Sequence, residues 1–152
     1  MITKLDNSNE KVANQIFTNF QQSYKVEAQL IGVIDFPPLL RTAEDIAVSK
    51  TKFYGFFENN HLAAVIEVSI ENMNLDIHSL TVAPQYFRKG IAGKLIGYIR
   101  ETFDFSTAIV ETAVVNTPAI NLYKKHGFIE FKQWTPSHGI EKVALSIEVA
   151  NS

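Results

Sequence analysis

The sequence VAPQYFRKGIAGKL, at residues 82–95, has the residue types needed to bind a phosphate chain. Gly90 stands where a strand-like segment turns into a helix-like one, and glycine there permits an unusual backbone angle and removes a Cβ that would block a ligand. The first amides of a helix lack partners within the helix, and together with the helix dipole they attract anions. Arg88 and Lys89 add positive charge. We therefore expect the amides of residues 88–93 to bind a pyrophosphate.

Other phosphate-binding loops fit this segment poorly. A Walker loop requires Gly-Lys followed by Ser or Thr, whereas Gly93 and Lys94 are followed by Leu95. The dinucleotide-binding fingerprint requires three glycines in G-x-G-x-x-G spacing, and only Gly90 and Gly93 stand here. Taken alone, the loop is also consistent with a basic helix start that binds nothing.

A second segment, NTPAINLYKKHGF at residues 116–128, has the signals of a short helix between two strands. Asn116 or Thr117 can cap this helix, and Pro118 suits its first turn. Gly127 is well placed to end it. The residues themselves therefore predict only a capped helix with a tyrosine inside it.

Together, the two segments resemble the acetyl-coenzyme A site of the GNAT superfamily of N-acetyltransferases. The first family signature runs Val-x-Pro, then Gln or Arg, then Gly-x-Gly or Gly-x-Ala before an apolar helix. It is matched by Val82, Pro84, Gly90, Ile91, Ala92 and Leu95. The second signature, Asn-x-x-Ala-x-x-Leu-Tyr-x-x-x-Gly-Phe, is matched by Asn116, Ala119, Leu122, Tyr123, Gly127 and Phe128. The sequence departs from the family at Phe87, where Gln or Arg is usual, and this departure concerns the affinity for the cofactor.

The resemblance implies a set of contacts to acetyl-CoA. The residues it assigns to this site are Leu80, Thr81, Val82, Arg88, Lys89, Gly90, Ile91, Ala92, Gly93, Asn116 and Tyr123. The family has a bulge near the strand before the phosphate loop, which frees backbone amides. Leu80 and Val82 would then pair with the pantetheine arm, while an amide polarises the acetyl carbonyl. Asn116 would hydrogen-bond the same arm or a bound water.

In the family, the tyrosine that corresponds to Tyr123 points at the cofactor sulfur. A phenol with a pKa of about 10 can donate a proton to a departing thiolate, whose conjugate acid has a pKa of about 8.5. Without the surrounding motif, Tyr123 would be interpreted as a core aromatic residue with a hydrogen-bonded hydroxyl. The motif favours the role of general acid.

Acetyl transfer to an amine also requires a proton acceptor. A lysine-like amine has a pKa of about 10.4, so its deprotonation at pH 7 costs roughly 4–5 kcal/mol. In a regular strand, Asp76, His78 and Leu80 would point to one face. Several GNAT branches place an acid or a histidine at positions aligned with Asp76 and His78. These two residues are therefore the first candidates for the general base or for a residue that relays its proton, and Glu67 is the third candidate. A solvated acid and a purely structural histidine are the alternatives.

The segments that position these residues alternate between strand and helix patterns. Strands are predicted at residues 2–5, 52–57, 62–70, 73–82, 107–115, 128–133 and 142–149. Helices are predicted from Asn7 or Ser8 to about Ser23, and at residues 42–49, 91–103 and 117–126. This order predicts an α/β (α+β) fold, a GNAT-like single domain over residues 1–152. We expect a central mixed, mostly antiparallel twisted sheet of about six or seven strands, flanked by about four helices.

The segment 26–41 is expected to be an irregular apolar loop, because Pro37 and Pro38 forbid a continuous helix. It occupies the place where the acceptor site of the family forms. Tyr24, Phe36, Pro37 and Arg41 could line that site, with ordinary packing under the loop as the alternative.

Composition limits the remaining classes. A chain of 152 residues with 46% hydrophobic residues fits one domain. The absence of cysteine excludes disulfides, thiolate metal sites and a cysteine nucleophile, and the four histidines lack ligand spacing, so we expect no metal. A net charge of -2 argues against nucleic acid and anionic membranes as partners. No apolar run is long enough to span a membrane and no signal-peptide pattern is present, so we expect a cytoplasmic protein.

We therefore predict an acetyl-CoA-dependent N-acetyltransferase, in which a primary amine attacks the bound thioester directly in a ternary complex. The missing cysteine agrees with direct attack. The alternative is a non-catalytic acyl-CoA-binding or regulatory module of the same fold, which Phe87 favours and which Tyr123 and Asn116 disfavour. The acceptor stays open among polyamines, antibiotics, amino acids, peptide N-termini and protein lysines. The family also allows a homodimer through the terminal strands.

Overall fold

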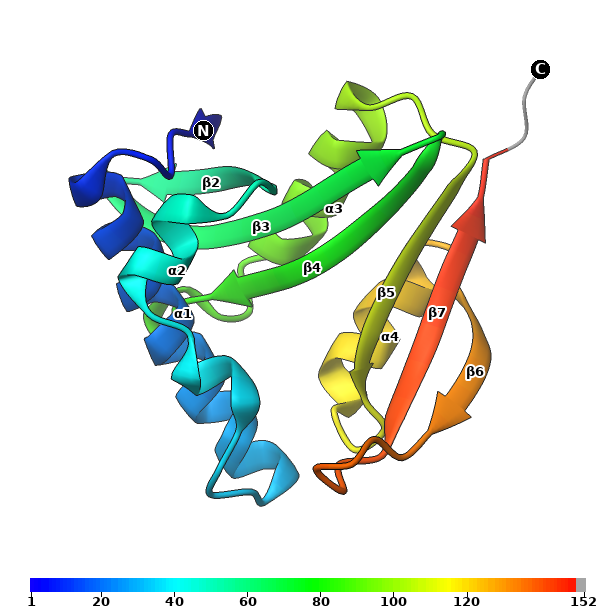
Figure 1. Cartoon of the computed structure of the whole chain (residues 1–152). Helices are drawn as coiled ribbons and strands as arrows, with labels where there is room; N and C mark the ends of the chain where they lie inside the picture. Colours follow the sequence, from blue (N-terminus) through cyan, green and yellow to red (C-terminus); the bar gives the residue numbers. More distant parts are fainter. Residues whose placement is uncertain (150–152) are drawn as a thin grey trace.

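The computed structural model describes residues 1–149 and arranges them as a seven-stranded sheet with helices on both faces (Figure 1). The strands are β1 (Ile2–Leu5), β2 (Lys52–Glu58), β3 (His61–Glu71), β4 (Asn74–Val82), β5 (Thr107–Ala113), β6 (Ile129–Trp134) and β7 (Lys142–Glu148). The helices are α1 (Glu10–Ile31), α2 (Ala43–Val48), α3 (Ile91–Thr102) and α4 (Thr117–Lys125), with short 3-10 turns at Pro37–Leu40 and Pro84–Tyr86. The strand order is β1-β2-β3-β4-β5-β7-β6, and β4 and β5 form the parallel pair. The predicted fold class, a mixed and mostly antiparallel sheet with four helices, is confirmed.

Helix α1 differs from its prediction at both ends. Asn9 caps it by accepting a hydrogen bond from the amide of Val12, whereas Asn7 donates to the carbonyl of Ile46 at the end of α2. The helix continues past Ser23 and ends at Gly32, whose φ of 74° is the left-handed conformation typical of a helix stop. The prediction of an irregular loop is therefore wrong for residues 26–31. A serine is a mild helix former and stops no helix by itself.

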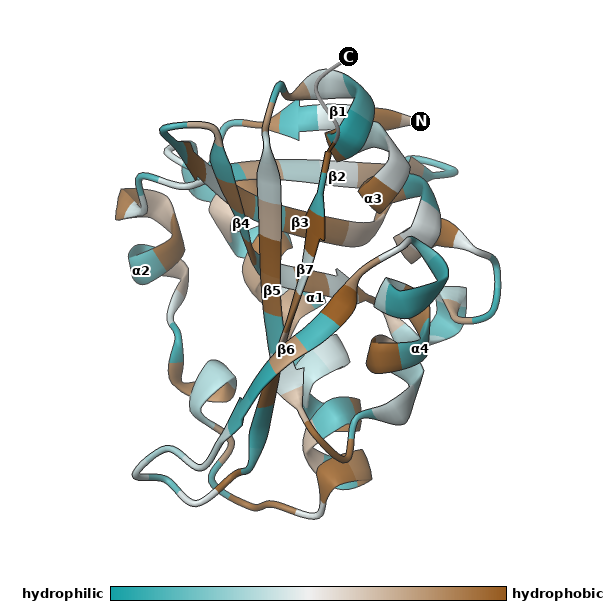
Figure 2. Cartoon of the chain, turned by 90° about the vertical axis from the view of Figure 1, so that its right-hand side faces the viewer, coloured by the Kyte–Doolittle hydropathy of each residue, from teal (hydrophilic) through white to brown (hydrophobic). Residues whose placement is uncertain are grey.

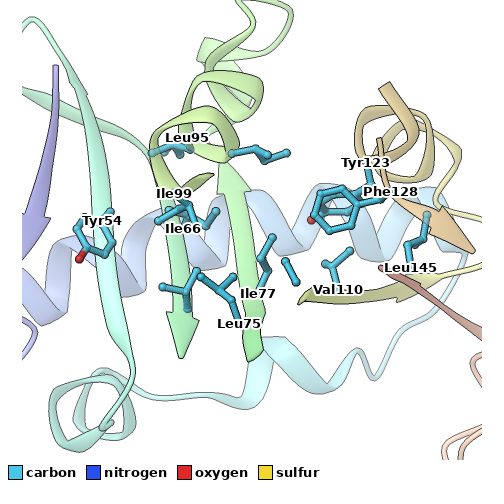
Figure 3. Close-up of a cluster of buried hydrophobic side chains, with 14 of the residues drawn as sticks. Tyr54, Ile66, Leu75, Ile77, Leu95, Ile99, Val110, Tyr123, Phe128 and Leu145 are labelled. Atoms are coloured by element: carbon cyan, nitrogen blue, oxygen red, sulfur yellow. The ribbon is translucent and has the colours of Figure 1, made fainter. Parts of the chain in front are cut away.

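The core has one layer on each face of the sheet. On one face, α3 and α4 pack on β3, β4, β5 and β7, through a cluster that includes Ile66, Ile77, Leu95, Ile99, Val110, Tyr123, Phe128 and Leu145 (Figure 3). On the other face, α1 and α2 pack on β2 and β3 through Ile16, Phe20, Ile46, Phe53 and Val65. Both layers are anchored on the sheet, so the helices hold fixed positions relative to the strands.

Strands β4 and β5 separate part-way along their length. Their parallel pairing runs from Asn74 opposite Thr107 to Ile77 opposite Val110, although β4 continues to Val82 and β5 to Ala113. Figure 1 shows the two strands diverging beyond the paired part. The last residues of each strand therefore face the space between them instead of each other.

A β-bulge lies in β4 just where this separation begins. The register with β3 shifts because Glu67 pairs with Ser79 while Val68 pairs with Ile77, which leaves His78 as the extra residue. Ile77 and Leu80 consequently pack against the same core layer, on the α3 side of the sheet. The expectation that Asp76, His78 and Leu80 share one face is wrong, because it assumed a regular strand. The bulge that the family resemblance implied is present.

At the far edge of the sheet, β6 forms an outer strand that alternates hydrophobic and hydrophilic segments (Figure 2). Ile129 and Phe131 on this strand are exposed, at 71% and 54%. The homodimer through the terminal strands stays a prediction. Over residues 1–149, none of the helices combines the length and apolarity needed to cross a membrane.

Candidate active site

Two adjoining cavities occupy the space where β4 and β5 diverge. The first, of about 540 Å³, lies between the end of β4, the start of α3, α1 and α4, and is called the α3 cavity below. The second, of about 450 Å³, lies between β4, β5, α1 and the Pro37–Leu40 turn, and is called the β5 cavity. A larger cavity, of about 870 Å³, lies between α1 and the β2–β3 turn and contains none of the predicted site residues. The predicted site therefore falls on the adjoining pair.

The α3 cavity contains the predicted phosphate loop. Within residues 1–149, the amides of residues 88–93 donate no hydrogen bond; the first bond of α3 runs from the Lys94 amide to the Gly90 carbonyl, at 3.2 Å. All six of these residues line the cavity, as do Leu80 and Val82 of β4. A row of free amides at the start of a helix is well suited to bind an anion.

The side chains around this loop add one cation that is free of ion pairs within residues 1–149. Lys89 Nζ lies 3.4 Å from Glu58 Oε2, so its charge is shared with a carboxylate. Arg88 forms no ion pair in the described part of the chain and lines the cavity, from a backbone position with a φ of 64°. Phe87, which replaces the usual polar residue, is 43% exposed and also lines the cavity. The amides and Arg88 thus provide most of the positive potential.

Gly90 has a φ of 73°, in the left-handed region, and an added Cβ would meet no atom within 4 Å. A Gly90→Ala variant should therefore lose about 1–2 kcal/mol of unfolding free energy through backbone strain alone. Urea titration measures this loss. Gly97→Ala is the matched control, because Gly97 lies within α3 and is equally unobstructed, so its stability should stay the same or rise by about 0.4–1 kcal/mol. Equal effects of both variants would contradict the role assigned to the backbone at Gly90.

Two other predicted cofactor residues have side chains that the structure already uses. Thr81 points to the α1 face, where its hydroxyl donates to Asn19 Oδ1 at 2.6 Å, its backbone pairs with Val65 of β3, and it lines neither cavity. Asn116 caps α4 with Oδ1, and its Nδ2 donates to Glu27 Oε1 and to Thr112 Oγ1. To contact pantetheine as predicted, Asn116 would have to use the second lone pair of Oδ1, or its Nδ2 would have to give up the hydrogen bond to Glu27.

Tyr123 lines the β5 cavity from α4. Its ring is 5% exposed and packs edge-on against Phe128, with centroids 5.6 Å apart, and Figure 3 shows its hydroxyl pointing toward β4, away from Leu145. Among residues 1–149 this hydroxyl has no hydrogen-bond partner, and it is not sealed from the cavity. Burial raises the pKa of Tyr123 above its ordinary value, with smaller contributions from Tyr24 and Glu27. The phenol is therefore protonated at neutral pH and able to donate.

The predicted bases occupy different places. Asp76 is exposed and lines neither cavity. His78 lines the β5 cavity, and its Nε2 lies 2.6 Å from Ser69 Oγ. The structure brings His78, but not Asp76, to the same cavity as Tyr123.

Glu67, the third candidate, is engaged on both oxygens. Arg41 donates to Oε1 at 2.7 Å and to Oε2 at 2.9 Å, and the hydroxyls of Thr51 and Ser79 donate as well, at 2.6 and 2.9 Å. Burial by itself would raise the pKa of Glu67, but the bonds from Arg41, Thr51 and Ser79 outweigh it and hold that pKa below its ordinary value. A carboxylate so stabilised is a weak proton acceptor.

Residues 15–128 match the sequence profile of the acetyltransferase (GNAT) family. The chain belongs to this family. It is similar, at 33% identity over 129 residues, to the UPF0157 protein YqkA of Bacillus subtilis (strain 168); the match covers 84% of the chain but 38% of that relative. The ribosomal-protein-S18-alanine N-acetyltransferase from Escherichia coli has a similar fold, with a TM-score of 0.75 at 16% identity over 100% of this chain and 95% of that one. The PaiA N-acetyltransferase from Thermoplasma acidophilum, solved in complex with coenzyme A, also has a similar fold. Its TM-score is 0.73 at 17% identity, and the match covers 95% of this chain and 96% of that one.

The GNAT site also contains polar residues that the sequence motifs do not mark. The β5 cavity is lined by Glu27 of α1, Glu111 of β5, Lys142 of β7 and His138 of the β6–β7 loop. No motif marks Glu27, which lies in residues 26–31, where the sequence predicts a loop. Its position one helical turn after Tyr24, which was predicted to line the acceptor site, was the available signal. Tyr24, Phe36, Pro37 and Arg41, the residues that the sequence indicates for an acceptor site, all line the β5 cavity.

Proposed function

We propose that this GNAT protein transfers an acetyl group from acetyl-CoA to a primary amine by direct attack in a ternary complex. One observation carries the proposal: the free amides of residues 88–93 line one cavity, the Tyr123 hydroxyl lines the next, and the two cavities adjoin. A molecule with a pyrophosphate at one end and a thioester at the other matches this arrangement. The PaiA N-acetyltransferase, whose fold is similar and whose structure was solved in complex with coenzyme A, supports it.

Each part of the site has a role in this reaction. The amides of residues 88–93 and Arg88 hold the pyrophosphate, and the edge of β4 that β5 leaves unpaired, at Leu80 and Val82, binds the pantetheine arm. The β5 cavity holds the acceptor amine. Tyr123 donates its proton to the departing thiolate from a phenol that is protonated at neutral pH.

Phe87 favours a second candidate, a non-catalytic acyl-CoA-binding or regulatory module. An exposed aromatic residue replaces the usual Gln or Arg beside the phosphate loop. Such a module would retain the α3 cavity and would need no acceptor in the β5 cavity. The open hydroxyl of Tyr123 counts against it.

Calorimetric titration with acetyl-CoA, followed by a thiol-release assay, separates the candidates. We expect acetyl-CoA to bind with a dissociation constant on the order of hundreds of micromolar or lower. We also expect at least one amine from a panel of spermidine, kanamycin, free lysine and lysine-containing peptides to increase the rate of thiol release. Absence of binding would contradict both candidates. Binding without amine-dependent thiol release from any acceptor would favour the non-catalytic module.

A further inference from the structure

Glu27 stands at the junction of the two cavities. Four residues line both the α3 cavity and the β5 cavity, and they are Tyr24, Glu27, Leu80 and Asn116. Burial raises the pKa of Tyr24, so this phenol stays neutral. Glu27 is therefore the residue that can bring a negative charge to the junction.

The carboxylate of Glu27 is held in place but not neutralised. Asn116 Nδ2 donates to its Oε1, while Oε2 has no hydrogen-bond partner and no ion pair within residues 1–149. The other carboxylates near these cavities are paired, Glu67 with Arg41 at 2.7 Å and Glu111 with Lys142 at 3.6 Å. A free carboxylate oxygen at the meeting point of two cavities is a ready partner for a cation.

Burial gives the same carboxylate a raised pKa, which the bond from Asn116 and the charge of Lys142 only partly offset. A carboxylate with a raised pKa is a stronger proton acceptor than an exposed one. The titratable groups that share the walls of the two cavities are Tyr24, Arg41, His78, Tyr86, Arg88, Lys89, Glu111, Tyr123, His138 and Lys142. Of the three carboxylates Glu27, Glu67 and Glu111, Glu27 is the one that has both an oxygen without a partner within residues 1–149 and a raised pKa.

Resting on the proposed acetyl transfer, we propose that Glu27 binds the ammonium group of the acceptor at the junction of the two cavities and takes its proton before the attack. The acceptor class is then a primary amine that is cationic at neutral pH. Binding the cation and making it nucleophilic would be done by the same oxygen. His78, whose Nε2 is bonded to Ser69, would have no part in this step.

The protons balance in this scheme. Glu27 takes one proton from the ammonium, and the neutral nitrogen forms the N–C bond as the C–S bond breaks. Tyr123 gives its proton to the thiolate and is restored by the second proton that the nitrogen loses. Glu27 then releases its proton to solvent, so that one amide, one free thiol and one proton are produced.

The test compares Glu27→Gln with the unsubstituted protein on two amines of similar size, at saturating acetyl-CoA. n-Propylamine is almost wholly cationic at pH 7, whereas aminoacetonitrile is mostly neutral. We expect kcat/KM at pH 7 to fall about 10²-fold or more for propylamine and less than about tenfold for aminoacetonitrile. Glutamine keeps the acceptor oxygen for Asn116, so affinity for acetyl-CoA should be unchanged.

The pH profile provides a second readout. With Glu27 in place, kcat/KM for propylamine should be flat between the pKa of Glu27 and the pKa of the amine, and it should fall below the pKa of Glu27. In Glu27→Gln it should rise tenfold per pH unit toward the pKa of the amine, because only the neutral amine can react. Glu10→Gln, at the exposed start of the same helix, is the control and should match the unsubstituted protein.

The role of Glu27 would be overturned if Glu27→Gln lowered kcat/KM equally for both amines. It would also be overturned if the pH profile of kcat/KM steepened in Glu111→Gln and not in Glu27→Gln. Failure of the proposed function looks different: the unsubstituted protein would then bind no acetyl-CoA or release no thiol with either amine.

Discussion

A Tyr123→Phe variant is expected to lose about 10²–10⁴-fold in kcat, the usual contribution of a general acid, while its affinity for acetyl-CoA stays the same. The substitution removes only the hydroxyl, which makes no hydrogen bond in the described residues, and keeps the ring that packs edge-on against Phe128. Stability should therefore change little. Thiol-release kinetics and calorimetric titration give the two quantities.

Tyr98→Phe is the matched control for this loss. Tyr98 lies on α3, packs against Tyr54 with centroids 5.5 Å apart, and lines neither the α3 cavity nor the β5 cavity. Its kcat should be that of the unsubstituted protein. An unchanged kcat in Tyr123→Phe would return Tyr123 to a packing role and leave the sulfur to be protonated by solvent.

The second large effect is on stability. Arg41→Ala should cost about 3–5 kcal/mol of unfolding free energy at pH 7, because it leaves the carboxylate of Glu67, 2% exposed, without its cation. Urea titration measures this cost. Lys124→Ala is the control, since Lys124 and Glu130 form an exposed pair at 3.2 Å and such pairs contribute about 0–1 kcal/mol. A loss in Arg41→Ala no larger than in the control would contradict the structural role of the Arg41–Glu67 pair.

The pH dependence of this loss follows from the lowered pKa of Glu67. A carboxyl whose pKa is lower in the folded than in the unfolded state stabilises the fold above the unfolded pKa. That contribution disappears as the pH falls through the folded pKa. In Arg41→Ala, only the hydroxyls of Thr51 and Ser79 still oppose the effect of burial, so the pKa of Glu67 should be higher than in the unsubstituted protein and its carboxyl should take up a proton at a higher pH. The difference between the variant and the unsubstituted protein should therefore shrink from pH 7 to pH 4.

The features that the sequence predicted correctly are the ones encoded by neighbouring residues. Gly90 follows a strand and precedes an apolar helix, so the free amides of residues 88–93 could be located without knowing the rest of the fold. Asn116 and Pro118 likewise mark the start of α4, and Asn116 is its cap. Helix starts and caps depend on a few consecutive residues, which is why short motifs report them faithfully.

The errors came from features without a local signal. Residues 26–31 are helical because the stop residue of α1 is Gly32, whose amide bonds back to the carbonyls of Ala28 and Gln29. The bulge at His78 arises from the pairing of two strands, so a regular alternation placed Leu80 on the wrong face. Asp76, which has a suitable side chain, turned out to lie outside both cavities.

By itself, the sequence determined the two halves of the proposed acyl-CoA site: a row of free amides before α3 and a tyrosine inside α4. Only the tertiary structure decided which groups meet between them. Glu27 reaches Asn116 across 89 positions of the chain, and Arg41 reaches Glu67 across 26. Such contacts depend on how far β4 and β5 diverge and on how α1 crosses the sheet. Local residue patterns encode the elements, whereas the distances between elements are set by the packing of the whole core.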